Sequence, residues 1–95
     1  MRVVVSSFGE ALNQQIRSYA EYRIFSELST HDDVVGASVD LQAAGDEVQC
    51  RVEVTLRSRS RVEARTSASY AAAAIDRAAE RLASLIGPRR GALST

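Results

Sequence analysis

Apolar and polar side chains alternate strictly along residues 48–56. Every second residue is apolar or a cysteine, and the residues between them are polar or charged. Because successive side chains of a strand point to opposite faces, this pattern predicts a strand with one buried face and one wet face. Such strands are typical of a sheet that is covered on one side only. The predicted inward row comprises Val48, Cys50, Val52, Val54 and Leu56.

Two amphipathic helices are predicted to cover this sheet. The first runs from about Glu10 to Leu28, with an apolar residue at every fourth position. The second is rich in alanine, begins near Ala71 and ends at Gly87-Pro88, since proline cannot continue a helix and glycine suits its end. Both helices present an apolar stripe of the width that a core-facing helix needs. The predicted stripes are Leu12, Ile16, Ala20, Ile24 and Leu28 in the first helix, and Ala71, Ile75, Ala78, Ala79, Leu82, Leu85 and Ile86 in the second.

Three further short strands complete the pattern. Residues 2–6 hold three valines, residues 35–41 alternate, and residues 62–66 alternate again. Gly45-Asp46 predicts a hairpin turn, and the serine- and arginine-rich residues 57–61 predict a wet loop. The predicted order is β-α-β-β-β-α. The fold class is therefore α+β, a two-layer sandwich of a four-stranded sheet with two helices packed on one face. Val35, Ala37, Val39 and Leu41 form the predicted inward row of the second strand.

The length of 95 residues predicts one domain with one core, which we assign to residues 1–88, followed by a flexible C-terminal tail over residues 89–95. No segment reaches the roughly 20 consecutive apolar residues that span a membrane. The first residues lack the apolar core of a signal peptide, and Cys50, the single cysteine, can form no internal disulfide. We therefore expect a cytoplasmic protein that does not bind membranes.

Charge is balanced overall but divided along the chain. Twelve basic residues, all of them arginines, oppose twelve acidic residues. Residues 32–56 hold one arginine against six acidic residues, whereas residues 57–95 hold eight arginines against three acidic residues. A local basic field attracts anions even when the net charge is zero. The C-terminal half is therefore the region in which we expect an anionic partner to bind.

Residues that could carry catalysis are few. His31, the only histidine, lies beside two aspartates in a predicted loop, and this group alone is a weak metal site. Cys50 is predicted to be buried, where cysteines are usually inert. Asp76 and Glu80 lie four apart beside Arg77 and Arg81, a spacing that favours ion pairs within the helix. We therefore expect no enzymatic activity, no cofactor, no metal and no small-molecule substrate.

Arginines on the two predicted helices form the candidate binding surface. If the helices lie side by side, their outward arginines can make one patch that contacts phosphates of a nucleic acid. The alternative is a solvated surface whose charges pair locally. The candidate residues are Arg17, Arg23, Arg77, Arg81, Arg89 and Arg90.

Two segments, together with the element order and the length, resemble one known family. Residues 16–23 read IRSYAEYR and residues 73–82 read AAIDRAAERL. They are similar to the ribosome hibernation-promoting factors, also called ribosome-associated inhibitors or ribosomal subunit interface proteins. The resemblance extends from Arg2 to Ile86. It implies the β-α-β-β-β-α fold, binding to the small ribosomal subunit, and repression of translation during stationary phase or stress.

The resemblance also implies which residues contact ribosomal RNA. Arg17 and Arg23 match basic residues of the family's first helix, and Arg81 matches one of its second helix. Arg89 and Arg90 stand in for the basic end of that helix, and Arg77 adds a charge at a position that is often apolar or small in the family. Longer members carry a further dimerisation domain, so the chain is interpreted as a short form or a fragment.

A different function stays open beside this one. A chain of this fold with zero net charge can be a protein-interaction or self-association module that has lost strong RNA binding, and a weak homodimer is considered as its partner. The wet face of the sheet carries the mixed charges that suit cross-strand pairs or a polar interface. Its residues are predicted to be Arg51, Glu53, Thr55, Arg57, Arg61, Glu63 and Arg65.

Overall fold

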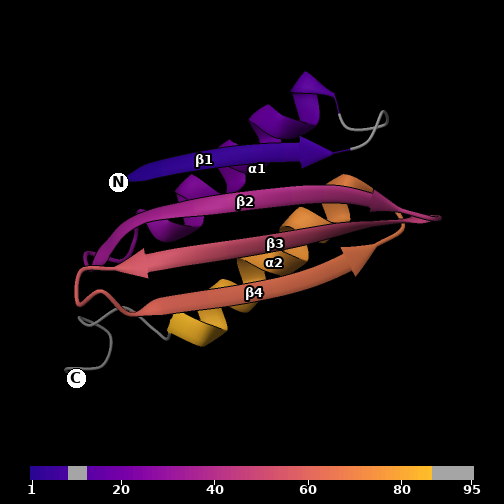
Figure 1. Ribbon diagram of the computed structural model, residues 1–95. Helices are drawn as coiled ribbons and strands as arrows, with labels where there is room; N and C mark the ends of the chain where they lie inside the picture. The colour runs from indigo at the N-terminus through magenta and orange to yellow at the C-terminus, as the bar shows by residue number, and fades with distance from the viewer. Residues whose placement is uncertain (9–12, 87–95) are drawn as a thin grey trace.

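One four-stranded sheet, with both helices on one of its faces, makes up the protein (Figure 1). The computed structural model describes residues 1–8 and 13–86. Strand β1 lies parallel to β2, whereas β2–β3 and β3–β4 are antiparallel, and the spatial order is β1-β2-β3-β4. The α+β sandwich predicted from the sequence is thereby confirmed. The elements are β1 (Arg2–Phe8), α1 (Gln14–Leu28), β2 (Val34–Ala44), β3 (Glu47–Leu56), β4 (Arg61–Ala68) and α2 (Ala71–Ile86).

Helix α1 is the crossover that the parallel pair β1–β2 requires, because two parallel strands cannot be joined by a tight turn. It begins at Gln14, and the side chain of Asn13 caps it by accepting a 3.0 Å hydrogen bond from the Ile16 amide. The predicted start at Glu10 and the apolar position Leu12 lie outside the described residues.

The core lies between the sheet and the two helices. The alternation of β3 is confirmed, since Val52 and Val54 have no exposed surface and Cys50 is 1% exposed. On α1, Ile24 and Leu28 are fully buried, as predicted. Together with Ala78, Ala79 and Leu82 of α2, these side chains form one continuous hydrophobic cluster.

Two predicted core positions are wrong. Leu85 is 46% exposed because it lies in the last turn of α2, where a side chain has neighbours on fewer sides. Val35 is 49% exposed because the β2–β3 register shifts between Val34 and Gly36. Such an irregularity turns the neighbouring side chain inward instead, so Val34 is buried.

The two hairpin loops lie at opposite ends of the sheet, and one of them is bonded to the α1–β2 loop. Gly45 has a φ of 61° in the predicted β2–β3 turn, a conformation that favours glycine. At the opposite end, the β3–β4 loop is exposed, as predicted, and Arg59 within it has a φ of 72°. The amide of Arg57 donates a 2.6 Å hydrogen bond to the Asp33 carbonyl, which ties this loop to the α1–β2 loop.

Candidate nucleic-acid interface

Helices α1 and α2 are joined by polar contacts between their side chains. The Tyr19 hydroxyl donates a 2.5 Å hydrogen bond to Asp76, and the Arg23 guanidinium lies 3.4 Å from the same carboxylate. Arg23 also lies 3.7 Å from Glu27 on its own helix. The hydrogen bond to Asp76, with a smaller contribution from burial, raises the pKa of Tyr19. Arg23 is thus half-buried and engaged by two carboxylates.

The prediction of ion pairs within α2 is wrong. Asp76 turns toward α1, and no ion pair among the described residues joins Asp76 or Glu80 to Arg77 or Arg81. Periodicity along one helix cannot reveal a partner that lies on another helix, and here the neighbouring helix supplies both Tyr19 and Arg23.

Two of the predicted arginines reach the edges of the sheet. Arg17 of α1 donates a 3.4 Å hydrogen bond to the carbonyl of Val5 in β1. Arg77 of α2 donates a 2.7 Å hydrogen bond to the carbonyl of Ser67 in β4. Since β1 and β4 are the two edge strands, each helix places a charged side chain against an edge, which hinders pairing with a further strand. Both arginines are exposed and retain free donor groups.

Arg81 is exposed, and within residues 1–8 and 13–86 it has no hydrogen-bond or ion-pair partner. It follows Arg77 by one helical turn, so the two guanidinium groups occupy the same side of α2. Arg89 and Arg90 lie outside the described residues. The structure therefore brings Arg77 and Arg81 together, while Arg17 and Arg23 lie apart from them on α1.

Acidic and basic side chains balance on each helix. Both α1 and α2 carry two arginines and two carboxylates. The surface predicted from the arginines alone is therefore not uniformly basic, because the sequence interleaves the two signs. Those residues are Arg17, Glu21, Arg23 and Glu27 in α1, and Asp76, Arg77, Glu80 and Arg81 in α2.

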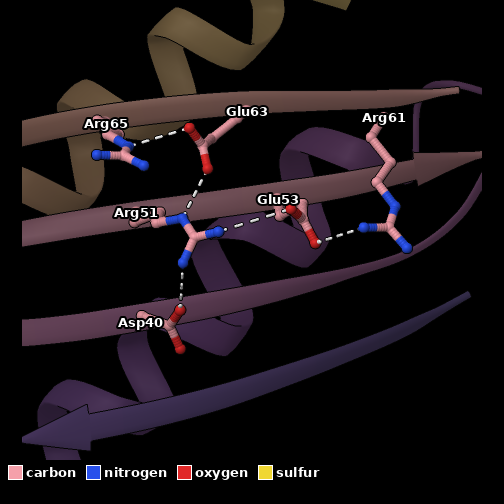
Figure 2. A network of polar contacts seen from close by, with 6 residues as sticks. All are labelled: Asp40, Arg51, Glu53, Arg61, Glu63 and Arg65. Carbon is pink, nitrogen blue, oxygen red and sulfur yellow. Dashed lines mark hydrogen bonds and ion pairs between the residues drawn. The ribbon is translucent and has the colours of Figure 1, made fainter.

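The face of the sheet that the helices leave uncovered, hereafter the open face, carries a network of ion pairs (Figure 2). Arg51 lies at its centre, with nitrogens 2.6 Å from Glu63, 3.6 Å from Asp40 and 3.6 Å from Glu53. Arg65 lies 3.0 Å from the other oxygen of Glu63. The cross-strand pairs predicted for this face are thus present.

Like charges face each other directly across β3 and β4, and the attractive pairs run diagonally. Arg51 is opposite Arg65, and Glu53 is opposite Glu63. Directly opposed like charges are unfavourable, but the diagonal neighbours are within reach of long side chains. Hydrogen bonds from Arg51 and Arg65 lower the pKa of Glu63, and the bond with Glu63 raises the pKa of Arg51.

Glu63 therefore makes the stability of the protein depend on pH in the acid range. Because its pKa is lower in the folded state, its stabilisation is present above the ordinary glutamate pKa and is lost as the pH falls through the folded value. We expect Glu63→Gln to lower the denaturation midpoint in urea at pH 7 and to have a smaller effect near pH 2.5. Glu47→Gln is the matched control, since Glu47 has no ion pair among the described residues. An equal effect of Glu63→Gln at both pH values would contradict the assignment.

A shallow hollow of about 640 Å³ lies on the open face beside this network. Arg65 and Ser67 of β4 line one of its sides. Arg61 and Arg65, with side chains 69% and 72% exposed, were predicted on the wet face of the sheet but not among the RNA-binding residues. The signal for them was present in the sequence, because Arg61, Glu63 and Arg65 alternate with the inward-facing residues of β4.

Two chemical possibilities remain to be considered, a nucleophilic Cys50 and a metal site. Burial raises the pKa of the Cys50 thiol to about 12, so this sulfur stays protonated near neutral pH and is a poor nucleophile. No group of three or more histidine, cysteine, aspartate or glutamate side chains within residues 1–8 and 13–86 could hold a metal ion. No helix in the described part of the chain is long and apolar enough to cross a membrane.

Comparison with known proteins gives one family and several related structures. The family described as Sigma 54 modulation protein / S30EA ribosomal protein matches residues 3–90. The N-terminal domain of Protein Y from Thermus thermophilus is 25% identical, with a TM-score of 0.71, covering 87% of this chain and 89% of that one. A ribosomal subunit interface protein from Coxiella burnetii has the same fold, with 14% identity, a TM-score of 0.73, and coverage of 90% of this chain and 94% of that one. No curated protein sequence is significantly similar to the chain.

Proposed function

The chain belongs to the Sigma 54 modulation protein / S30EA ribosomal protein family, and on that premise we propose that it is a non-catalytic factor of the small ribosomal subunit. In this proposal the protein represses translation during stress or stationary phase by occupying ribosomes that would otherwise be active. The observation that carries it is the family match over residues 3–90, nearly the whole chain of 95 residues. A protein with this role acts in the cytoplasm, where ribosomes work.

Two further observations support the proposal. The related structures include a ribosomal subunit interface protein that shares the fold over 90% of this chain. Cys50 is buried and protonated, and the described residues hold no metal-binding group, so binding accounts for the chemistry of the chain better than catalysis does. No cofactor or small-molecule substrate is part of the proposal.

Ribosomal RNA is the proposed point of attachment on the subunit. Arginine suits this role because its guanidinium can make two parallel hydrogen bonds to one phosphate. Arg77 and Arg81 are the principal contacts in our proposal, because both are exposed on one side of α2. Arg17 and Arg23 contribute less, since Arg23 is already engaged by Asp76 and Glu27. Arg89 and Arg90, which lie outside the described residues, are included in the proposal from the sequence alone.

Co-sedimentation with purified ribosomes and with separated subunits tests this function. We expect the protein to pellet with the small subunit at about 50 mM salt and to dissociate progressively toward about 200 mM, since phosphate contacts weaken steeply with salt. Addition of the protein to a cell-free translation reaction should then reduce synthesis in proportion to occupancy. Absence from the small-subunit pellet at the lower salt concentration would overturn the proposal.

A protein-interaction or self-association module is the second candidate, and the balanced charge favours it. Each helix is neutral, and the carboxylates of the open face are paired with its arginines. Sedimentation velocity over a hundredfold range of protein concentration separates the two functions. A monomer throughout that range, together with small-subunit binding, would exclude the module, whereas a dimer without ribosome binding would favour it.

A further inference from the structure

Acidic and basic side chains of helix α2 face different neighbours. Asp76 is bonded to Tyr19 and Arg23 and therefore faces α1, whereas Arg77 is bonded to Ser67 and therefore faces β4. Residues four apart share one side of a helix. Glu80 consequently lies beside Asp76 and is exposed, and Arg81 lies with Arg77 on the β4 side.

The surface where the two helices meet is acidic as a result. Arg23 lies between two carboxylates there, 3.7 Å from Glu27 and 3.4 Å from Asp76, and Glu80 follows Asp76 by one helical turn. An anionic polymer laid across both helices would meet these carboxylates at close range, and like charges brought together at an interface are strongly unfavourable. The carboxylates are Glu27, Asp76 and Glu80.

The opposite side of α2 continues onto an edge of the sheet that is basic. β4 is an edge strand, and its Arg61 and Arg65 are exposed. Its single acidic residue, Glu63, is already bonded to Arg51 and Arg65. Arg61 lies 3.8 Å from Glu53 in a looser pair that leaves most of its guanidinium in water.

Ser67 links the two groups of arginines into one surface. Its carbonyl accepts the hydrogen bond from Arg77, and the residue lines the same hollow as Arg65. The two groups of arginines therefore adjoin at β4, one on α2 and the other on the open face. We call this surface the β4–α2 edge and define it by Arg61, Arg65, Arg77 and Arg81.

We propose that the phosphodiester backbone of ribosomal RNA docks along the β4–α2 edge rather than across the two helices. This inference rests on the proposed ribosome binding and states which side of the protein faces the RNA. Four arginines against two paired carboxylates, Glu53 and Glu63, suit a continuous chain of phosphates. Arg61 and Arg65 lie about 13 Å apart along the strand, and Arg77 and Arg81 about 6 Å apart along the helix, so the contact follows a polymer rather than a single ion.

The test is binding of wild-type protein and two charge-matched variants to purified small subunits in a salt titration. R61Q/R65Q removes two positive charges from the β4–α2 edge. R2E changes the net charge by the same amount on β1, at the opposite edge of the sheet, and serves as the control. All these side chains are exposed, and circular dichroism checks that each variant is folded.

We expect R61Q/R65Q to bind about tenfold more weakly than wild type near 100 mM salt. The slope of log affinity against log salt should become shallower by about 1.4–1.8, because two phosphate contacts are lost. R2E should bind within about twofold of wild type. Equal affinities of R61Q/R65Q and R2E, with wild type still bound, would overturn the inference and leave the proposed function standing.

Two other outcomes would also decide the matter. Failure of the wild-type protein to bind small subunits at low salt would overturn the inference together with the proposed function.

Poly-L-glutamate and poly-U, added at equal charge concentration, compare an acidic polypeptide with RNA as competitor. Displacement by poly-L-glutamate alone would assign the edge to an acidic protein surface instead, whereas stronger competition by poly-U supports RNA.

Discussion

Reversing the charge of both α2 arginines, in an R77E/R81E variant, is expected to weaken binding to the small ribosomal subunit by roughly 100-fold. Two favourable contacts with phosphates become two repulsive ones, and like charges at an interface strongly oppose association. Fold stability should change little, because both side chains are exposed and only the Arg77 bond to the Ser67 carbonyl is lost. Quantitative co-sedimentation near 100 mM salt measures the effect.

The matched variant R77K/R81K keeps both charges and removes the planar guanidinium groups. We expect it to bind within about fivefold of wild type, because lysine contacts phosphate as a point charge but cannot form the two parallel hydrogen bonds of arginine. Affinity of R77E/R81E equal to that of R77K/R81K would exclude α2 from the interface. The thermal midpoints of the two variants, measured in parallel, report whether either substitution disturbs the fold.

Leu82→Ala is expected to lower the free energy of unfolding by about 2–5 kcal/mol, the range for fully buried leucines truncated to alanine. Leu82 has no exposed surface and belongs to the cluster that joins α2 to the sheet. A domain of this size has a total stability of about 5–14 kcal/mol, so the variant would lose a large part of it. Urea denaturation followed by circular dichroism gives the difference.

Leu85→Ala is the control on the same helix. Leu85 is 46% exposed, so truncation removes less buried area and leaves no enclosed cavity. We expect a loss below about 1 kcal/mol, within the range of surface substitutions. Equal losses for the two variants would mean that Leu85 is packed as tightly as Leu82, as the periodicity of the sequence alone suggested, and would contradict the observed burial.

Strands and helices with clean periodicity could be predicted because burial alone sets their pattern. The alternation of residues 48–56 fixes which face of β3 is buried, and the apolar stripe of α2 fixes its inward side. Val35 could not be placed correctly, because the register shift beside Gly36 depends on the pairing with β3 rather than on local sequence. The exposure of Leu85 likewise depends on which neighbours surround the end of α2.

The candidate site could be predicted from the sequence only in part. The excess of arginine after residue 57 pointed to the C-terminal half, which contains all four residues of the β4–α2 edge. The direction in which each arginine points is decided by partners far away in the chain, such as Tyr19 and Arg23 for Asp76, 57 and 53 residues apart. Helical spacing could place Arg77 and Arg81 on one side of α2 but could not show that this side adjoins β4.

The most direct test of this account is a cryo-electron microscopy structure of the protein bound to the small ribosomal subunit. We predict that α2 and β4 face ribosomal RNA, with phosphates within hydrogen-bond distance of Arg77, Arg81 and at least one of Arg61 and Arg65. The acidic surface around Asp76 should then face away from the RNA backbone. A bound protein whose β4–α2 edge faces solvent, with RNA packed across the two helices, would contradict the account.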